Sequence, residues 1–180
     1  CLHVCNSHGS FIIEDCDFGY AGDDCINIHD NSSMGIQLLD SHTLLARRVT
    51  KESVLFETGY PVELRNPDLS PTGFSSLLTA VQYSPGTKTC RLTFADALPE
   101  GLSTDTVLWN KRFSTQNYII RGCRFTNNRA RGVLLQGSNG MLVNNVFENI
   151  QGAAIQIETG CESRWSEGHG DYPRQCHPPL

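Results

Sequence analysis

The sequence predicts an all-β protein: a parallel β-helix that carries an inserted, small antiparallel β module. A short motif recurs in three places without gaps, and only strand-length apolar runs and polar or glycine turns lie around it. Between the first copy and the other two, the repeat gives way to a stretch in which prolines punctuate short strand-like runs. Since no segment shows an apolar stripe of helical period and length, strands are predicted throughout.

Composition sets limits on the class of protein. The 180 residues are 39% hydrophobic and 18% charged, with 16 glycines. That length suits one domain, or one core with an insertion, and the low charge argues against a disordered chain or a coiled coil. Acidic residues outnumber basic ones, 19 against 14, and no basic run could neutralise several phosphates, so a nucleic-acid partner is disfavoured. No apolar stretch approaches the roughly 20 residues of a membrane span.

Each copy of the motif ends in a phenylalanine, and an aliphatic pair spaced by two follows eight residues later. The copies are segments 13–18, 120–125 and 142–147, and the pairs are Ile26 with Ile28, Val133 with Leu135, and Ile155 with Ile157. One unit of this size cannot bury its own apolar face. Copies that stack at the strand spacing of about 4.8 Å share a continuous core in which equivalent residues form columns, which is the pattern of a parallel β-helix.

Four segments follow from the repeat and from the place where it stops. They are β-helix coils over 1–36, an inserted antiparallel β module over 37–112, further coils over 113–160 and a Gly/Pro-rich tail over 161–180. Within the insertion, strands are predicted at 54–56, 77–81, 91–94 and 106–109. The phenylalanine column and the column of Cys16, Cys123 and Asn145 are predicted to line the interior or the turns.

Eight cysteines are spread through a chain that is too long and too apolar to need dense cross-linking. Cys161 and Cys176 bracket the tail, where a disulfide is expected if the compartment is oxidising. Two other interpretations stay open. The thiols are free, or Cys161, His169, Cys176 and His177 bind zinc, although their spacing matches no usual zinc finger.

One coil differs from the others by a pair of acids, Asp23 and Asp24, within the segment GDDCINIH at 22–29. The equivalent positions hold Ala130 and Arg131 in the second copy and small residues in the third. The pair is predicted to follow a turn, with both carboxylates toward the outer face. Neighbouring acids favour a state in which one carboxyl keeps its proton while another is ionised, as glycoside hydrolysis by acid and base requires. Alternatively, the acids only form a turn before the strand, with Asp24 paired to Arg131.

Segments 3–30 and 117–168 resemble glycoside hydrolase family 110, the α-1,3-galactosidases that remove terminal galactose, including from blood-group B type glycans. The resemblance rests on GDDCINIH at 22–29, NNRARGVLL at 127–135 and GAAIQIETGCESRWSEG at 152–168. It implies a right-handed β-helix that hydrolyses a glycan with inversion, without a metal or another cofactor. We expect such an enzyme to be extracellular or periplasmic.

The family's paired aspartates map onto Asp23 and Asp24, which are the predicted catalytic residues. A further aspartate of the family precedes a histidine by three residues. Matching that histidine to His3 places the acid immediately before Cys1, and the coil register puts the same position over Asp24. We therefore expect this chain to be the C-terminal part of a larger β-helix enzyme, inactive by itself because that acid is missing.

Two other functions stay open. The family 28 polygalacturonases also carry Gly-Asp-Asp-Cys on a β-helix, but the Gly-His-Gly that they have about one coil later is found here only at 168–170. The alternative from another class is a noncatalytic β-helix that binds glycans or is purely structural, since the fold alone does not fix the function.

Five further residues are predicted to bind substrate or to support the acids: His29, Arg129, Arg131, Glu158 and Trp165. His29 either hydrogen-bonds a sugar hydroxyl or is an exposed residue at a strand end. The two arginines either keep a carboxylate ionised or contact substrate. Trp165 either stacks on a sugar ring or caps the core. Glu158 shares the column of His29.

Overall fold

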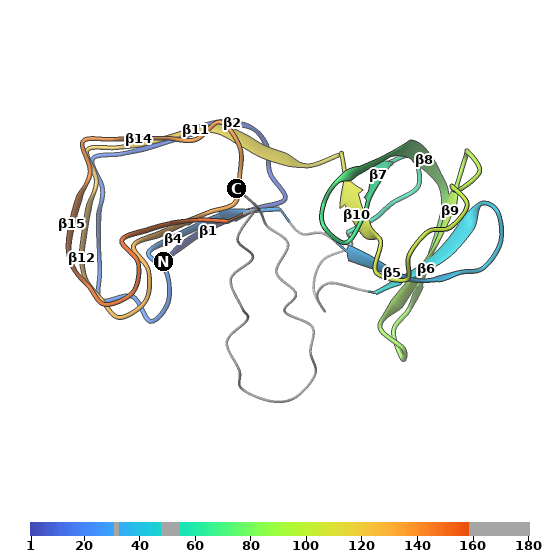
Figure 1. Cartoon of the computed structure of the whole chain (residues 1–180). Coiled ribbons are helices and arrows are strands. Elements are labelled where there is room, and N and C mark those ends of the chain that lie inside the picture. The colour runs from blue at the N-terminus through green and yellow to red at the C-terminus, as the bar shows by residue number, and fades with distance from the viewer. Residues whose placement is uncertain (31–32, 48–54, 159–180) are drawn as a thin grey trace.

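The computed structural model describes residues 1–30, 33–47 and 55–158 (Figure 1). Within these ranges the chain consists of strands joined by turns, with no helix. Ten strands form the three sheets of a parallel β-helix, and six close into an antiparallel barrel beside it. The predicted fold class, a β-helix with an inserted antiparallel β module, is confirmed. In the described part of the chain, no helix is long and apolar enough to cross a membrane.

Each sheet of the β-helix takes one strand from each coil. The first sheet contains, in spatial order, β1 (Leu2–Cys5), β4 (Ile26–His29), β13 (Val133–Leu135) and β16 (Ile155–Ile157). The second contains β14 (Met141–Val143), β11 (Ser114–Arg121) and β2 (His8–Glu14), and the third contains β15 (Val146–Ile150), β12 (Arg124–Asn128) and β3 (Asp17–Gly19). All pairings within these sheets are parallel.

Equivalent residues of neighbouring coils are register partners, as the repeat predicts. The observed columns are Leu2, Ile26, Val133 and Ile155 in the first sheet, Ile13, Ile120 and Leu142 in the second, and Phe18, Phe125 and Phe147 in the third. A shift of one residue would turn every inward side chain outward, so the alternating apolar pattern fixes this register.

A stack of three phenylalanine rings forms one side of the β-helix core. Phe125 is fully buried, and its ring centroid lies 5.1 Å from that of Phe18 and 4.6 Å from that of Phe147, with nearly parallel planes. Ile26 and Ile28 belong to the same apolar cluster and are fully buried. Large aromatic side chains dominate such a core because each removes about 150–250 Å² from water.

The turns repeat a left-handed residue at the same place in successive coils. Asp15, Gly122 and Asn144 form one such column, with φ of 52°, 61° and 52°. In another, Asn127 and Asn149 adopt φ of 51° and 54°, and Nδ2 of Asn149 donates to Oδ1 of Asn127 at 3.1 Å. Asn, Asp and Gly tolerate this conformation better than other residues, which explains why they mark the breaks between strands.

The column of Cys16, Cys123 and Asn145 lines the next part of the turn. Cys123 is buried, whereas Cys16 is exposed. The backbone N–H of Cys123 donates to Oδ1 of Asn145 at 2.9 Å, and Nδ2 of Asn145 donates to the carbonyl of Ile120 at 2.8 Å. Asn145 therefore fastens one coil to the next. Burial raises the pKa of the Cys123 thiol.

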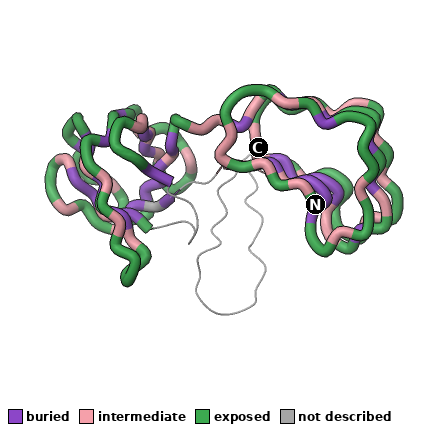
Figure 2. Tube along the Cα trace, turned by 180° about the vertical axis from the view of Figure 1, so that it is seen from behind, coloured by how far each residue is buried: buried purple, intermediate pink, exposed green. Residues whose placement is uncertain are grey.

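The barrel interrupts the β-helix between β4 and β11. Its strands, in order around the wall, are β10 (Val107–Asn110), β5 (Ser33–Leu38), β6 (Thr43–Arg47), β9 (Thr89–Phe94), β8 (Pro71–Ser84) and β7 (Pro61–Arg65). The pairings are antiparallel. An apolar cluster of its own fills the barrel, and Figure 2 shows buried segments in both the barrel and the β-helix.

The barrel strands cover residues 33–110, whereas the sequence places the insertion over 37–112. Leu55 and Phe56 are predicted to lie in a strand, but they pack into the barrel core without strand pairing. The carbonyl of Leu55 accepts a hydrogen bond from the side-chain amide of Asn110 instead. The apolar run correctly predicts that these residues are buried. It does not predict that the side chain of Asn110, on β10, takes the place of a neighbouring strand as hydrogen-bond partner.

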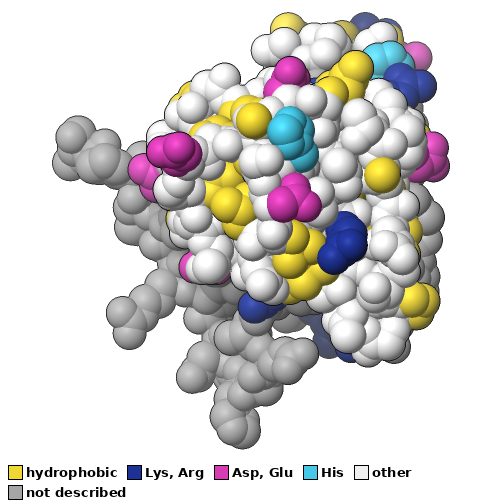
Figure 3. Space-filling view, turned by 90° about the vertical axis from the view of Figure 1, so that its right-hand side faces the viewer, with side chains coloured by type: hydrophobic (Ala, Val, Ile, Leu, Met, Phe, Trp, Pro, Cys, Tyr) yellow, Lys and Arg dark blue, Asp and Glu magenta, His cyan; other side chains and the backbone are white. Residues whose placement is uncertain are grey.

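The surface at the barrel end of the molecule is mixed in charge. In Figure 3, the Lys and Arg side chains are scattered over the described part of this face, with Asp, Glu and hydrophobic side chains between them. Proteins that follow a phosphate backbone instead gather basic side chains along one face.

Candidate active site at the edge of the first sheet

The paired acids lie directly before β4. Within this strand, Ile26 and Ile28 are buried in the β-helix, while Asn27 and His29 are half-buried on the opposite face. This alternation follows from the two-residue period of a strand. On β4, the outer face of the first sheet therefore carries polar side chains. The acids stand at the end of this face where β4 begins.

Asp23 is exposed, and its side chain shapes the turn. Oδ1 of Asp23 accepts the backbone N–H of Asp24 at 2.9 Å. The neighbouring coil holds the turn from the other side. Nδ2 of Asn128 donates to the carbonyl of Asp23 at 3.0 Å, and Nε of Arg129 donates to the carbonyl of Gly22 at 2.9 Å.

Asp24 is buried, with 2% of its surface exposed, and it forms a two-point ion pair with Arg131. Nε of Arg131 donates to Oδ1 at 2.7 Å, and Nη2 donates to Oδ2 at 2.9 Å. The backbone N–H of Arg131 adds a third hydrogen bond to Oδ1, at 3.2 Å. Two parallel N–H donors match the geometry of a carboxylate and stabilise its charged form.

The same ion pair acts on the arginine. Hydrogen bonding to Asp24 raises the pKa of the Arg131 guanidinium above its ordinary value, although burial acts in the opposite direction. The guanidinium of Arg131 therefore keeps its charge beside the carboxylate. The sequence predicts that both acids face outward, but the structure separates them into an exposed Asp23 and a buried, paired Asp24.

A polar network continues from Arg131 across the outer face. Nη1 of Arg131 lies 3.4 Å from Oε1 of Gln156. Glu158 accepts hydrogen bonds from Nε2 of Gln156 and, at 3.2 Å, from Nε2 of Gln136. These side chains belong to the coils of β13 and β16, and the ion pair between Arg131 and Asp24 connects them to a third coil, that of β4.

The structure brings together some of the predicted site residues and separates others. Arg131 contacts a carboxylate, which is one of its two predicted roles, whereas Arg129 holds a backbone carbonyl. Glu158 belongs to the network beyond Arg131. His29 lies at the far end of β4, where its Nε2 is 2.5 Å from Nε2 of His3 on β1. Trp165 and the tail cysteines and histidines lie outside the described residues.

Sequence reasoning missed the role of Asn128. It is buried, and Nδ2 donates both to the carbonyl of Asp23 and, at 2.9 Å, to that of Arg131. One amide therefore positions the two chain segments that carry the ion pair. The pair Asn127-Asn128 signals only a turn, because nothing local reveals what a side chain reaches 105 positions earlier in the chain.

The fold and this face define a right-handed parallel β-helix protein with a carboxylate site at a sheet edge. A family model described as a right-handed beta helix region matches residues 82–167. With the register of the coils, this makes the chain a right-handed β-helix protein that resembles the α-1,3-galactosidases of glycoside hydrolase family 110.

Eight curated matches carry that name, and three of them show the extent of the similarity. An α-1,3-galactosidase B of Akkermansia muciniphila is 28% identical over 171 residues, which cover 92% of this chain and 21% of the relative. An α-1,3-galactosidase A of Shewanella woodyi is 29% identical over 161 residues, covering 88% and 26%. An α-1,3-galactosidase B of Bacteroides fragilis is 27% identical over 162 residues, covering 81% and 26%. The chain thus spans about a quarter of the length of these relatives.

Proposed function

We propose that this chain contributes the paired carboxylates of an inverting glycoside hydrolase that releases terminal α-linked galactose from glycans. The observation that carries the proposal is the aspartate pair before β4, in which the buried Asp24 pairs with Arg131 while Asp23 faces solvent. Relatives named α-1,3-galactosidase support the substrate class. A secreted or periplasmic location fits an enzyme that meets glycans.

The two carboxylates suit different parts of this chemistry. Inversion requires one carboxylate that activates water and one carboxylic acid that protonates the leaving oxygen. Asp24 fits the base, since Oδ2 accepts one hydrogen bond from Arg131 and keeps a further acceptor site. Asp23 is accessible and fits the acid. No cofactor enters this scheme.

The test measures galactose release from an aryl α-galactoside by the longest natural protein that contains this chain. Asp23→Asn and Asp24→Asn each keep the side-chain shape and remove proton transfer, so we expect turnover to fall by about 10²–10⁴-fold. Asp105→Asn, at an exposed carboxyl of the barrel, is the matched control and should leave turnover unchanged. Near-normal turnover of both site variants would remove the proposed roles.

A second candidate is a noncatalytic β-helix that binds glycans or serves as structure. The buried ion pair favours it, because Asp24 and Arg131 join two coils as a purely structural pair would. This candidate predicts glycan binding without galactose release. It also predicts that Asp24→Asn lowers the stability of the fold while any glycan affinity stays the same.

A further inference from the structure

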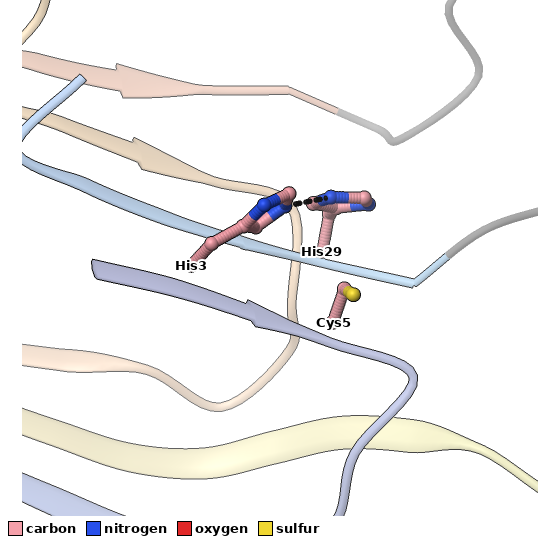
Figure 4. A group of neighbouring side chains, drawn as sticks. All are labelled: His3, Cys5 and His29. Atoms are coloured by element: carbon pink, nitrogen blue, oxygen red, sulfur yellow. Dashed lines mark hydrogen bonds between the residues drawn. The ribbon is translucent and has the colours of Figure 1, made fainter. Parts of the chain in front are cut away.

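Three side chains with metal-binding atoms converge on the outer face of the first sheet, at the end opposite the acids. His3 and Cys5 come from β1, and His29 comes from β4 (Figure 4). Their ligand atoms all lie within 4.8 Å of one another, and the two Nε2 atoms are 2.5 Å apart. We propose that His3, Cys5 and His29 form a zinc site that joins β1 to β4.

The parallel register explains why these three residues meet. Cys5 is the register partner of His29, and His3 is the partner of Asn27 on the same strand. Because side chains two apart share a face, His3 and Cys5 stand together on one side of β1, with His29 beside them. The site thus follows from the backbone pairing and requires no movement of either strand.

The distances suit a metal after small side-chain rotations. A tetrahedral zinc with nitrogen at about 2.05 Å and sulfur at about 2.3 Å places its ligand atoms roughly 3.3–3.6 Å apart. The two imidazole nitrogens are closer than that, so a bound ion would move them apart by about 1 Å. His3 and Cys5 are exposed and His29 is half-buried, so the rings have room to turn.

The donor set selects the type of ion. Two imidazoles and one thiolate suit borderline-soft ions such as Zn²⁺, whereas Mg²⁺ and Ca²⁺ prefer oxygen ligands. Three protein ligands leave a fourth position for water or an external ligand. Asp30 adds negative charge beside Cys5, and Thr115 fixes its carboxylate by hydrogen bonds of 2.8 Å and 2.5 Å. That charge attracts a cation.

A buried acceptor lies next to His3. Oδ1 of Asn27 has no hydrogen-bond partner among the described residues, although Asn27 is the register neighbour of His3. A metal-bound imidazole usually donates its second N–H to such an acceptor, which orients the ring. Asn27 supplies this acceptor at the right strand position.

The zinc site is separate from the aspartate pair. His29 is the last residue of β4, whereas the acids precede its first residue, Ile26, so the two sites share no side chain. We expect the ion to affect the stability of the fold, because zinc would link β1, the outermost described strand of the first sheet, to β4. An ion that binds only the folded protein raises the folded-to-unfolded ratio about 100-fold at 100 times its Kd.

The experiment titrates the reduced, metal-free chain with Zn²⁺ in competition with a chromophoric chelator, and with Co²⁺ as a spectroscopic probe. A background that carries Cys161→Ser, His169→Gln, Cys176→Ser and His177→Gln removes the other candidate ligands. We expect one Zn²⁺ per chain and a Co²⁺ spectrum with tetrahedral d–d bands and a thiolate charge-transfer band. His3→Gln, Cys5→Ser and His29→Gln should each weaken Zn²⁺ binding by at least about 10-fold.

Two controls decide the outcome. His8→Gln alters an exposed histidine on β2 and should leave Zn²⁺ affinity unchanged. Asn27→Leu keeps all three ligands and should weaken binding through the orientation of His3. The proposal is overturned if Cys5→Ser leaves affinity and the charge-transfer band intact, or if Co²⁺ gives only a weak octahedral spectrum. Neither readout depends on galactose release, so the result stands apart from that of the glycosidase assay.

Discussion

The ion pair between Asp24 and Arg131 joins residues that are 107 positions apart in the chain. One partner is almost fully buried, and the other has 23% of its side chain exposed. Removing Arg131 leaves the carboxylate of Asp24 almost fully buried and unpaired, and this costs more than the intact pair contributes. The site and the stability of two coils therefore depend on the same contact.

Arg131→Met tests this dependence. The side chain keeps similar volume but leaves the Asp24 carboxylate unpaired, so we expect a loss of about 3 kcal/mol in the free energy of unfolding. Urea denaturation at neutral pH measures it. The matched control is Arg121→Met, which breaks an ion pair with Glu14 whose side chains are 51% and 49% exposed and should cost less than about 1 kcal/mol. Equal effects of the two variants would argue against a special role for the buried pair.

Gly140 illustrates a requirement of close packing. A Cβ atom at this position would overlap the ring of Tyr118, which is buried in the β-helix core. We expect Gly140→Ala to destabilise the fold by about 1–3 kcal/mol, as overpacking does. Gly86→Ala is the comparison, since nothing lies within 4 Å of its Cβ position. Thermal unfolding of the two variants distinguishes them, and a similar midpoint for both would show that the ring moves at no cost.

At the scale of secondary-structure elements, the stacked phenylalanine rings pack β3, β12 and β15 of successive coils against one another. Phe125 is the middle ring, so truncating it removes contacts with both neighbours. Phe125→Ala should cost about 3–5 kcal/mol, whereas Phe125→Leu, which keeps most of the apolar volume, should cost about 1 kcal/mol. Equilibrium unfolding in urea measures both. A small loss for the alanine variant would mean that neighbouring rings close the cavity.

The barrel has its own electrostatic link, between β7 and the chain after β10. Oε1 of Glu63 lies 2.8 Å from Nε of Arg65, and Oε2 lies 3.1 Å from Nζ of Lys111. Burial alone would raise the pKa of Glu63, but hydrogen bonds and charge from Lys111 and Arg65 outweigh it and leave the pKa below its ordinary value of 4.5.

A lowered carboxyl pKa stabilises the folded state above the ordinary value, and this contribution is lost as the pH falls through the folded pKa. Glu63→Gln should therefore reduce the stability of the barrel near pH 7 and have a smaller effect near pH 3. Unfolding curves at several pH values measure this. Glu100→Gln, at an exposed barrel position, is the control. An effect of Glu63→Gln that is the same at both pH values would contradict the prediction.

At the scale of the whole molecule, the described residues form two apolar clusters, one in the β-helix and one in the barrel. The clusters have no residue in common, so the two parts are expected to open as separate cooperative units. The chain crosses between them twice, after β4 and before β11.

Leu92→Ala, in the centre of the barrel, tests this independence. The substitution should cost about 2–5 kcal/mol and increase amide hydrogen exchange in β5 to β10. Exchange in β11, β12 and β15 should stay unchanged, and so should the protection around Asp24. Mass spectrometry of exchanged peptides measures both regions in one experiment. Faster exchange in the β-helix strands would show that the two cores are coupled.

The sequence determined the β-helix and its register. Period-2 alternation chooses which face of a strand is buried, and the repeat of Phe125 at Phe147 sets the length of a coil, so both features are local. The positions of the turns are also predicted locally, because Asn and Gly recur at the left-handed residues of successive coils. The repeat by itself therefore aligns Asp24 with Arg131 in one column and indicates that they could pair.

Only the tertiary structure decided which of the aligned side chains are buried and which contacts they make. It buried Asp24 and left Asp23 exposed, it used Asn128 to hold the two segments of the site, and it brought His29 onto His3. It also closed the insertion into a barrel, in which the side chain of Asn110 replaces a strand partner for Leu55. These outcomes depend on the direction and reach of side chains from coils far apart in the chain, and local pattern carries no information about either.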